Sequence, residues 1–248
     1  MIYIKSKSEI QKIRESSRII AEALQFIEKI ITPGIDTRTL DREIESFILS
    51  KKARPAFKGL YGFPAATCIS INEEVVHGIP GKRKLVEGDI VGIDIGVELN
   101  NYFGDAAKTF MVGNVSPKVR HLCQVTEKSL ELGISQCRSG KRVGDISAAV
   151  QTHVEENGYS VVRDLVGHGV GYKPHEDPQI PNFGKKGKGP ILKEGMVLAV
   201  EPMVNMGTYR VLIDNDEWTV RTMDGLPSAH YEHTVAITEN GPLILSVI

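Results

Sequence analysis

Residues 90–112, IVGIDIGVELNNYFGDAAKTFMV, contain two apolar runs on either side of a short polar turn. The first run, residues 90–97, is rich in β-branched side chains, and an extended pattern resumes over residues 102–112. This pattern predicts a β-hairpin with its turn centred on Leu99–Asn100.

Two aspartates lie in this hairpin. A turn at Leu99–Asn100 places Asp94 directly opposite Asp105, with their Cβ atoms roughly 5 Å apart. Like charges at that distance destabilise a sheet unless a positive charge lies between them. A solvated acidic hairpin is the alternative, but the apolar residues around Asp94 predict a strand buried on both faces. The pair therefore favours one divalent cation, or two cations roughly 4 Å apart that share bridging carboxylates.

The composition is that of an ordinary globular chain. Its 248 residues are enough for one large domain or two small ones. The formal net charge of −1 gives no reason to expect nucleic acid or a membrane as a partner. Three cysteines (Cys68, Cys123 and Cys137) without a CxxC motif indicate a reducing compartment. The N-terminus has neither a signal-peptide nor a transmembrane pattern, so the expected location is the cytoplasm.

The predicted elements occur twice along the chain. A capping-box pattern at Ser6 opens the first of two helices, extended segments follow, and the order restarts after Asn114. Gly34 aligns with Gly140, and residues 85–94 align with residues 192–201 at nearly the same separation. We therefore expect a single domain, residues 1–248, built from an internal repeat of residues 8–113 and 116–239. Asp94 and Glu201 would meet at its centre.

The second half supplies further candidate ligands. His168 lies in the glycine-rich run of residues 166–171, and Glu201 and Glu232 lie in or beside apolar strand patterns. An unpaired carboxylate costs several kcal/mol to bury, so these acids need a partner. The complete set suits a pair of Mn, Fe, Co or Zn ions better than one structural zinc. It consists of Asp94, Asp105, His168, Glu201 and Glu232.

Seven short motifs resemble those of the type I methionine aminopeptidases, the bacterial form within the M24 metallopeptidase family, and they follow the family's order along essentially the whole chain. They occupy residues 72–81, 92–96, 104–106, 167–171, 174–176, 200–203 and 231–234. The resemblance implies an α/β (α+β) "pita-bread" fold, in which two pseudo-symmetric αα-plus-antiparallel-sheet halves surround a central metal site.

The resemblance also implies a role for each ligand. Asp105 and Glu232 would bridge two divalent ions, Asp94 would hold one ion, and His168 with Glu201 would hold the other. Glu201 would additionally shuttle a proton of the metal-bound water.

Other residues would contact the peptide. The resemblance implies this for His77 and His175, with His175 stabilising the developing oxyanion. His230 and His233 would orient their neighbours and not bind metal. Residues expected to line the methionine pocket or its entrance are Phe63, Cys68, Met203 and Trp218. Around the same pocket, Phe57, Leu60 and Pro174 replace the family's usual cysteine, tyrosine and phenylalanine, so its shape is expected to differ.

The implied activity is removal of the initiator methionine from new proteins when the second residue is small. A hydroxide bridging two Co, Mn, Fe or Zn ions would attack the first peptide bond. Expected partners are N-terminal peptides of nascent chains and the ribosome, with no nucleic acid and no membrane, and the chain is expected to be a monomer. The alternatives are a proline-directed peptidase of the same superfamily and a metal-free binding protein on this fold.

Overall fold

The computed structural model describes all 248 residues, as four long helices and many short strands. The helices are α1 (Lys7–Glu28), α2 (Thr37–Ser50), α3 (Pro117–Ser135) and α4 (Val143–Glu156), with a short 3-10 helix η1 (Leu60–Gly62). The first half contains β1 (Arg54–Pro55), β2 (Cys68–Ile71), β3 (Glu74–Val76), β4 (Ile90–Leu99) and β5 (Tyr102–Met111). The second contains β6 (Ser160–Val161), β7 (Val166–Gly169), β8 (Glu176–Pro181), β9 (Val197–Val200), β10 (Met203–Asn205), β11 (Val211–Ile213), β12 (Val220–Thr222), β13 (Ser228–His230), β14 (His233–Thr238) and β15 (Gly241–Ile244).

The predicted hairpin is confirmed as β4 and β5, but the predicted turn is wrong by one residue. The turn lies at Asn100 and Asn101, whose φ angles are 54° and 64°. A tight hairpin turn of this hand requires positive φ at both central residues. Asparagine tolerates that conformation far better than leucine does, which explains why Leu99 stays in the strand.

The corrected register changes how the two aspartates face each other. Asp94 pairs with Ala107, and Asp105 pairs with Gly96. The carboxylates are therefore diagonal neighbours and not directly opposed. They still lie on the same face of the sheet, because their positions differ from direct pairing by two residues.

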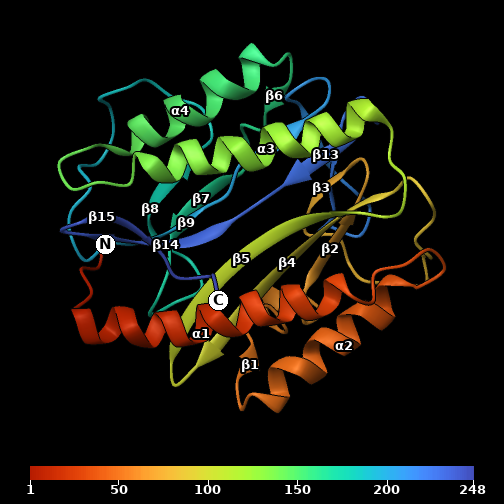
Figure 1. The fold of residues 1–248 in the computed structure, drawn as a ribbon, viewed down its shortest axis with the longest axis horizontal. Helices are drawn as coiled ribbons and strands as arrows, with labels where there is room; N and C mark the ends of the chain where they lie inside the picture. Colours follow the sequence, from red (N-terminus) through yellow and green to blue (C-terminus); the bar gives the residue numbers. More distant parts are fainter.

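The two halves have the same arrangement of helices and strands. In the first half β4 lies between β5 and β2, and in the second half β9 lies between β14 and β7. All these pairings are antiparallel. Figure 1 shows α1 and α2 along one side of the strands and α3 and α4 along the opposite side. The internal repeat itself stays a prediction.

Each half has its own apolar core. One cluster packs α1 and α2 against β2, β4 and β5, and includes Ile20, Ile44 and Ile93. The other packs α3 and α4 against β9 and β14.

The predicted capping box begins α1. The Ser6 side chain accepts the Glu9 amide hydrogen, and the Glu9 side chain accepts the amide hydrogen of Ser6. None of the helices is long and apolar enough to cross a membrane.

Hydrogen bonds join the halves where β5 lies beside the start of β14. The Thr234 hydroxyl accepts the amide hydrogen of Asp105 at 2.9 Å and donates to the Asp105 carbonyl at 2.6 Å. The Glu232 amide donates to the Ala107 carbonyl at 2.9 Å. Asp105 and Glu232 are thereby fixed beside each other.

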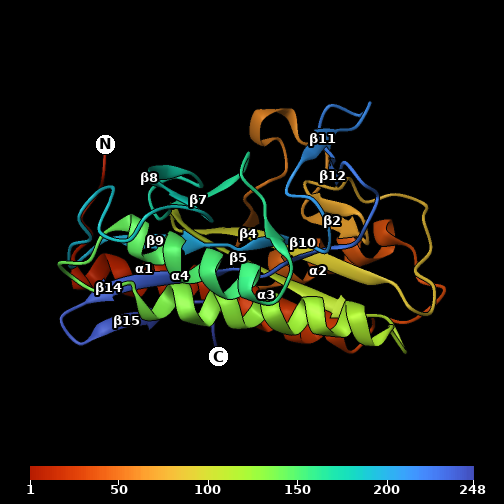
Figure 2. The same cartoon turned by 90° about the horizontal axis from the view of Figure 1, so that it is seen from above.

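Figure 2 shows β11 and β12, from the small β11–β12–β3 sheet, projecting away from helix α3.

The close contact between α1 and β5 depends on Gly104. A Cβ atom at Gly104 would lie 2.9 Å from backbone atoms of Ser17 in α1. We expect Gly104→Ala to lower the free energy of unfolding by about 1–3 kcal/mol, because the helix would have to move away from the strand. Urea denaturation measures the change. Gly81→Ala is the matched control, since its Cβ would meet no atom closer than 3.8 Å; an equal loss in both variants would contradict this account.

Candidate metal centre

A cavity of about 600 Å³ is lined by all the predicted metal ligands and all the residues predicted to bind the peptide. These residues come from both halves of the chain. They are His77, Asp94, Asp105, His168, His175, Glu201 and Glu232 at the polar end, and Phe63, Cys68, Met203 and Trp218 at the apolar end. Phe57 and Leu60 also line the cavity, whereas Pro174 does not, which corrects the expected position of Pro174.

Four carboxylates converge at the polar end of the cavity. Asp94 and Asp105 lie on β4 and β5, Glu201 directly follows β9, and Glu232 lies between β13 and β14. Asp105 and Glu232 are 4% and 2% exposed. One oxygen each of Asp94, Asp105 and Glu232 is buried without any hydrogen-bond partner. Such oxygens are rare in proteins, and they indicate that a cation belongs here.

Burial raises the pKa of all four carboxyl groups. The pKa of Asp94 rises to about 7 and that of Glu201 to about 8. The pKa values of Asp105 and Glu232 rise well above the usual range, because burial is reinforced by the charges of the neighbouring carboxylates. The group therefore resists ionisation until a positive charge reaches it.

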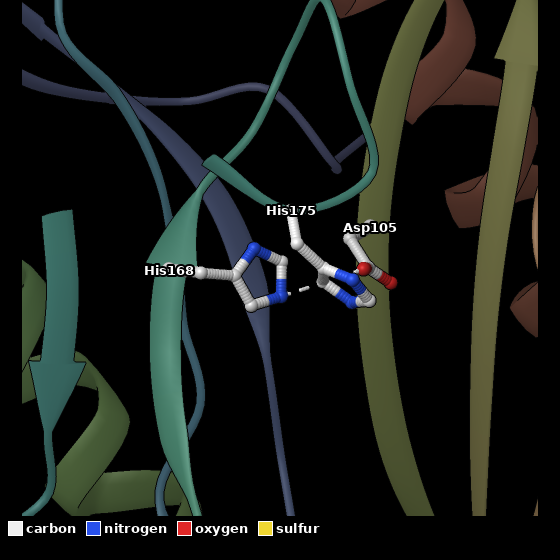
Figure 3. Close-up of side chains that lie close together, drawn as sticks. All are labelled: Asp105, His168 and His175. Carbon is white, nitrogen blue, oxygen red and sulfur yellow. Dashed lines mark ion pairs between the residues drawn. The ribbon is translucent and has the colours of Figure 1, made fainter. Parts of the chain in front are cut away.

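His168 does not supply that charge. Its Nε2 atom lies 3.4 Å from Glu201 and 3.8 Å from Asp105, and Figure 3 shows the His168 ring pointing toward Asp105 and His175. Burial lowers the pKa of His168 to about 3, so the ring is neutral at physiological pH. A neutral imidazole cannot form a true ion pair with either carboxylate, but its nitrogen lone pair is available to a metal.

Ligand atoms gather in three overlapping groups, each with its atoms within 4.8 Å of one another. The groups are Asp94–Asp105–Glu232, His168–Glu201–Glu232 and Asp105–His168–His175. Glu232 belongs to the first two groups, and Asp105 to the first and third. The five predicted ligands, four carboxylates and one imidazole, fit divalent Mn, Fe, Co or Zn. The donor set and the unpartnered oxygens both fit a pair of such ions.

Two further histidines border the carboxylates. His77 has a positive φ of 58°, an uncommon conformation for a non-glycine residue and one found at many functional sites. Burial lowers the pKa of His77 to about 4 and also lowers that of His175. The His175 ring packs edge-on against His168, with ring centres 4.5 Å apart. Both rings are therefore neutral hydrogen-bonding groups.

His230 lies behind Glu201 and does not line the cavity. Its side chain is buried, and its Nε2 atom lies 3.5 Å from Glu201 without a hydrogen-bond partner. Burial lowers the pKa of His230 as well. Its position agrees with an orienting role, as the sequence suggested.

The apolar end of the cavity is built from aromatic rings and a thiol. Phe63 and Trp218 meet edge to face, with centres 5.2 Å apart. Cys68 pairs directly with Asp94 across β2 and β4, so the thiol faces the cavity beside the carboxylates. Burial raises the pKa of Cys68, which makes the thiol a poor nucleophile. Phe57 occupies the space over Gly96, where a Cβ would lie 2.6 Å from its ring.

Some lining residues were not found from the sequence. Tyr61, Tyr3 and Leu165 border the cavity, and the Tyr61 ring stacks 6.2 Å from that of His175. Tyr61 also has a positive φ, of 51°. Its only signal in the sequence is its place in a glycine-rich loop, which does not specify contact with a residue far along the chain.

Comparison with known proteins gives a consistent result. Metallopeptidase family M24 matches residues 11–239. A methionine aminopeptidase of Clostridium perfringens is 54% identical over 248 residues, which is 100% of both chains. The crystal structure of a methionine aminopeptidase from Thermotoga maritima superimposes with a TM-score of 0.98 at 46% identity, over 100% of both chains. A prolidase from Pyrococcus furiosus gives 0.81 at 26% identity, over 99% of this chain but 65% of that one.

The raised carboxyl pKa values predict how the metal-free protein responds to pH. Between pH 6.5 and 8 the histidines of the unfolded chain lose their remaining protons, which opposes the trend, but the four carboxyls bind the larger number of extra protons in the folded state and so decide it. Their folded pKa values exceed the unfolded ones, so the folded chain binds more protons and loses stability as pH rises. We expect chelator-treated protein to unfold at a lower temperature at pH 8 than at pH 6.5. Adding Mn²⁺ at pH 8 should reverse the loss, since the ion binds the folded chain.

Two variants test the cause of this trend. Asp105→Asn should reduce the pH dependence, because it removes one of the four carboxyls, and should abolish the response to Mn²⁺. Glu131→Gln, at an exposed surface pair, should change neither. Stability that is constant from pH 6.5 to 8 in the chelated wild type would contradict the assignment.

Proposed function

The chain belongs to metallopeptidase family M24, and we propose that it removes the initiator methionine from new polypeptides whose second residue is small. It is a metal-dependent exopeptidase with the pita-bread fold that the sequence predicted. The observation that supports this substrate most strongly is the cavity, which joins a carboxylate cluster to an apolar end formed by Phe63, Cys68 and Trp218. An unbranched apolar side chain next to a free amine fits that arrangement.

We propose two divalent ions per chain, chosen from Mn, Fe, Co and Zn. Asp94 would hold one ion, His168 and Glu201 the other, and Asp105 and Glu232 both, in agreement with the overlapping ligand groups. When bound, such ions polarise the carbonyl of the scissile bond and activate water at neutral pH. Their charge also allows the buried carboxyls to ionise.

The remaining steps fall to side chains of this chain. His77 and His175 would bind the peptide, and His175 would donate a hydrogen bond to the carbonyl oxygen as negative charge develops on it. Glu201 would accept a proton from the attacking water through a carboxylate oxygen and pass it to the departing amine. The free α-amine of the substrate would be held near the carboxylates, which restricts cleavage to the first bond.

The side-chain pocket would be apolar like the family's usual one but different in shape. The resemblance leads one to expect a cysteine at Phe57 and a tyrosine at Leu60. Phe57 is bulkier than cysteine, whereas Leu60 is smaller than tyrosine and has no hydroxyl. Phe57 packs over Gly96, and Gly96 is the residue directly opposite Asp105 in the β4–β5 ladder. We therefore propose the same reaction with an altered preference among inhibitors that fill this pocket.

Two alternatives have weaker support. The prolidase likeness covers only 65% of that protein and stands at lower identity than the methionine aminopeptidase likeness. A metal-free binding protein has no evident use for a complete ligand set with unpartnered buried oxygens. We further propose that one chain acts alone, as a single domain, in the cytoplasm on chains leaving the ribosome. Its three buried free cysteines support a reducing compartment.

Peptide hydrolysis tests the proposed function. Metal-free protein reconstituted separately with Mn, Fe, Co and Zn should cleave Met-Ala-Ser, cleave Met-Leu-Ser far more slowly and leave Ala-Pro-Ser intact. A chelator and Asp105→Asn should each abolish the cleavage, and Glu131→Gln should retain it. A preference for Ala-Pro-Ser would show a proline-directed peptidase instead, and no turnover with any metal would favour the binding protein.

The role of His175 has its own test. His175→Ala removes a neutral donor from the carbonyl oxygen, so kcat for Met-Ala-Ser should fall about 100- to 1,000-fold. KM should change much less, because the interaction strengthens only in the transition state. A variant with a raised KM and an unchanged kcat would place His175 in ground-state binding alone.

A further inference from the structure

A buried ion pair lies next to the cavity but outside the carboxylate cluster. Lys5, which precedes α1, places its Nζ atom 2.5 Å from Oε2 of Glu176, at the start of β8. Their side chains are 1% and 0% exposed. A buried ion pair often contributes little net stability, because both charges lose their hydration. Such a pair can instead fix the position of the segments that carry it.

The Glu176 carboxylate closes the turn that carries His175. Its Oε1 atom accepts the amide hydrogen of Tyr172 at 2.6 Å and that of Lys173 at 3.0 Å. Its Oε2 atom is the one bound to Lys5. His175 directly precedes Glu176, so the orientation of this carboxylate determines how the turn of residues 172–176 presents the imidazole.

The path of Lys5 is itself tightly defined. The Lys5 amide donates to the Gly195 carbonyl at 2.8 Å. A Cβ at Gly171 would lie 2.9 Å from the Lys5 Cε atom, and one at Gly195 would lie 2.7 Å from the Lys5 carbonyl oxygen. Glycine at both positions therefore makes room for the lysine. The rings of Tyr3 and Tyr172 flank its Nζ atom, with centres 5.7 and 5.4 Å away.

We propose that Lys5 is a positioning residue for catalysis, which acts through Glu176 to hold the turn that presents His175 to the substrate carbonyl. The inference rests on the proposed function for the role of His175. It links a segment at the beginning of the chain to a reacting group more than half the chain away. A misplacement of about 1 Å at a reacting group can cost about 100-fold in rate. Correct placement of His175 can therefore outweigh the free-energy cost of burying the Lys5 and Glu176 charges.

A double-mutant cycle tests the proposal. Lys5→Met keeps the length of the side chain and removes its charge, and should lower kcat for Met-Ala-Ser about 10- to 100-fold with little change in KM. In a His175→Ala background Lys5→Met should cause no further loss, because Lys5 acts only through that imidazole. Equal losses in both backgrounds would overturn the proposal and leave Lys5 a residue of general stability.

The matched control is Lys7→Met, which removes a lysine two residues away whose pair with Glu239 is exposed. It should keep the wild-type kcat. If Lys5→Met fails to fold, Lys5→Met/Glu176→Gln removes the unpaired buried charge while leaving an oxygen for the Tyr172 and Lys173 amides. This double variant should show the same loss of kcat, and a wild-type kcat in it would overturn the proposal.

A readout independent of turnover separates this inference from the proposed function. In metal-free protein, the His175 imidazole resonances in a ¹H–¹⁵N NMR spectrum should shift in Lys5→Met and stay in place in Lys7→Met. Unchanged His175 resonances in Lys5→Met would refute the link between Lys5 and the imidazole. An inactive wild type would count against the proposed function, and the NMR comparison would still decide whether Lys5 positions His175.

Discussion

Four carboxylates buried in one cavity, without a cation of the protein to pair them, form the constraint on which the site depends. Burial and mutual repulsion both raise their pKa values, and the neutral ring of His168 does not offset the effect. A chain folded for stability alone would place apolar residues at these positions. Stability lost here is recovered when divalent cations bind, so the folded protein and its cofactor are thermodynamically coupled.

The fold holds this unfavourable cluster together through the junction of its two halves. The Thr234 hydroxyl bonds both backbone groups of Asp105, and the Glu232 amide bonds Ala107 on the same strand. Each half contributes a sheet whose outer face is covered by its own helices, and the two apolar clusters support the sheets independently. The acids that repel one another are thus carried on strands that cannot easily separate.

Much of the site could be predicted from the sequence, for an identifiable reason. Moving a hairpin turn by one residue changes each cross-strand partner by two positions, so Asp94 and Asp105 stay on one face despite the misplaced turn. The position of the turn follows from the positive φ of Asn100 and Asn101, a conformation that the alternation of apolar residues does not encode. Contacts between distant segments could not be predicted in the same way. The burial of Lys5 against Glu176 and the stacking of Tyr61 on His175 depend on tertiary packing, and no local pattern encodes them.

Anomalous diffraction from crystals grown with Mn²⁺ tests the central claim most directly, because it locates the ions without reference to activity. We expect two peaks in the cavity, one beside Asp94 and one beside His168 and Glu201, with Asp105 and Glu232 in contact with both. A cavity without a peak, or ions held by residues outside this set, would contradict it.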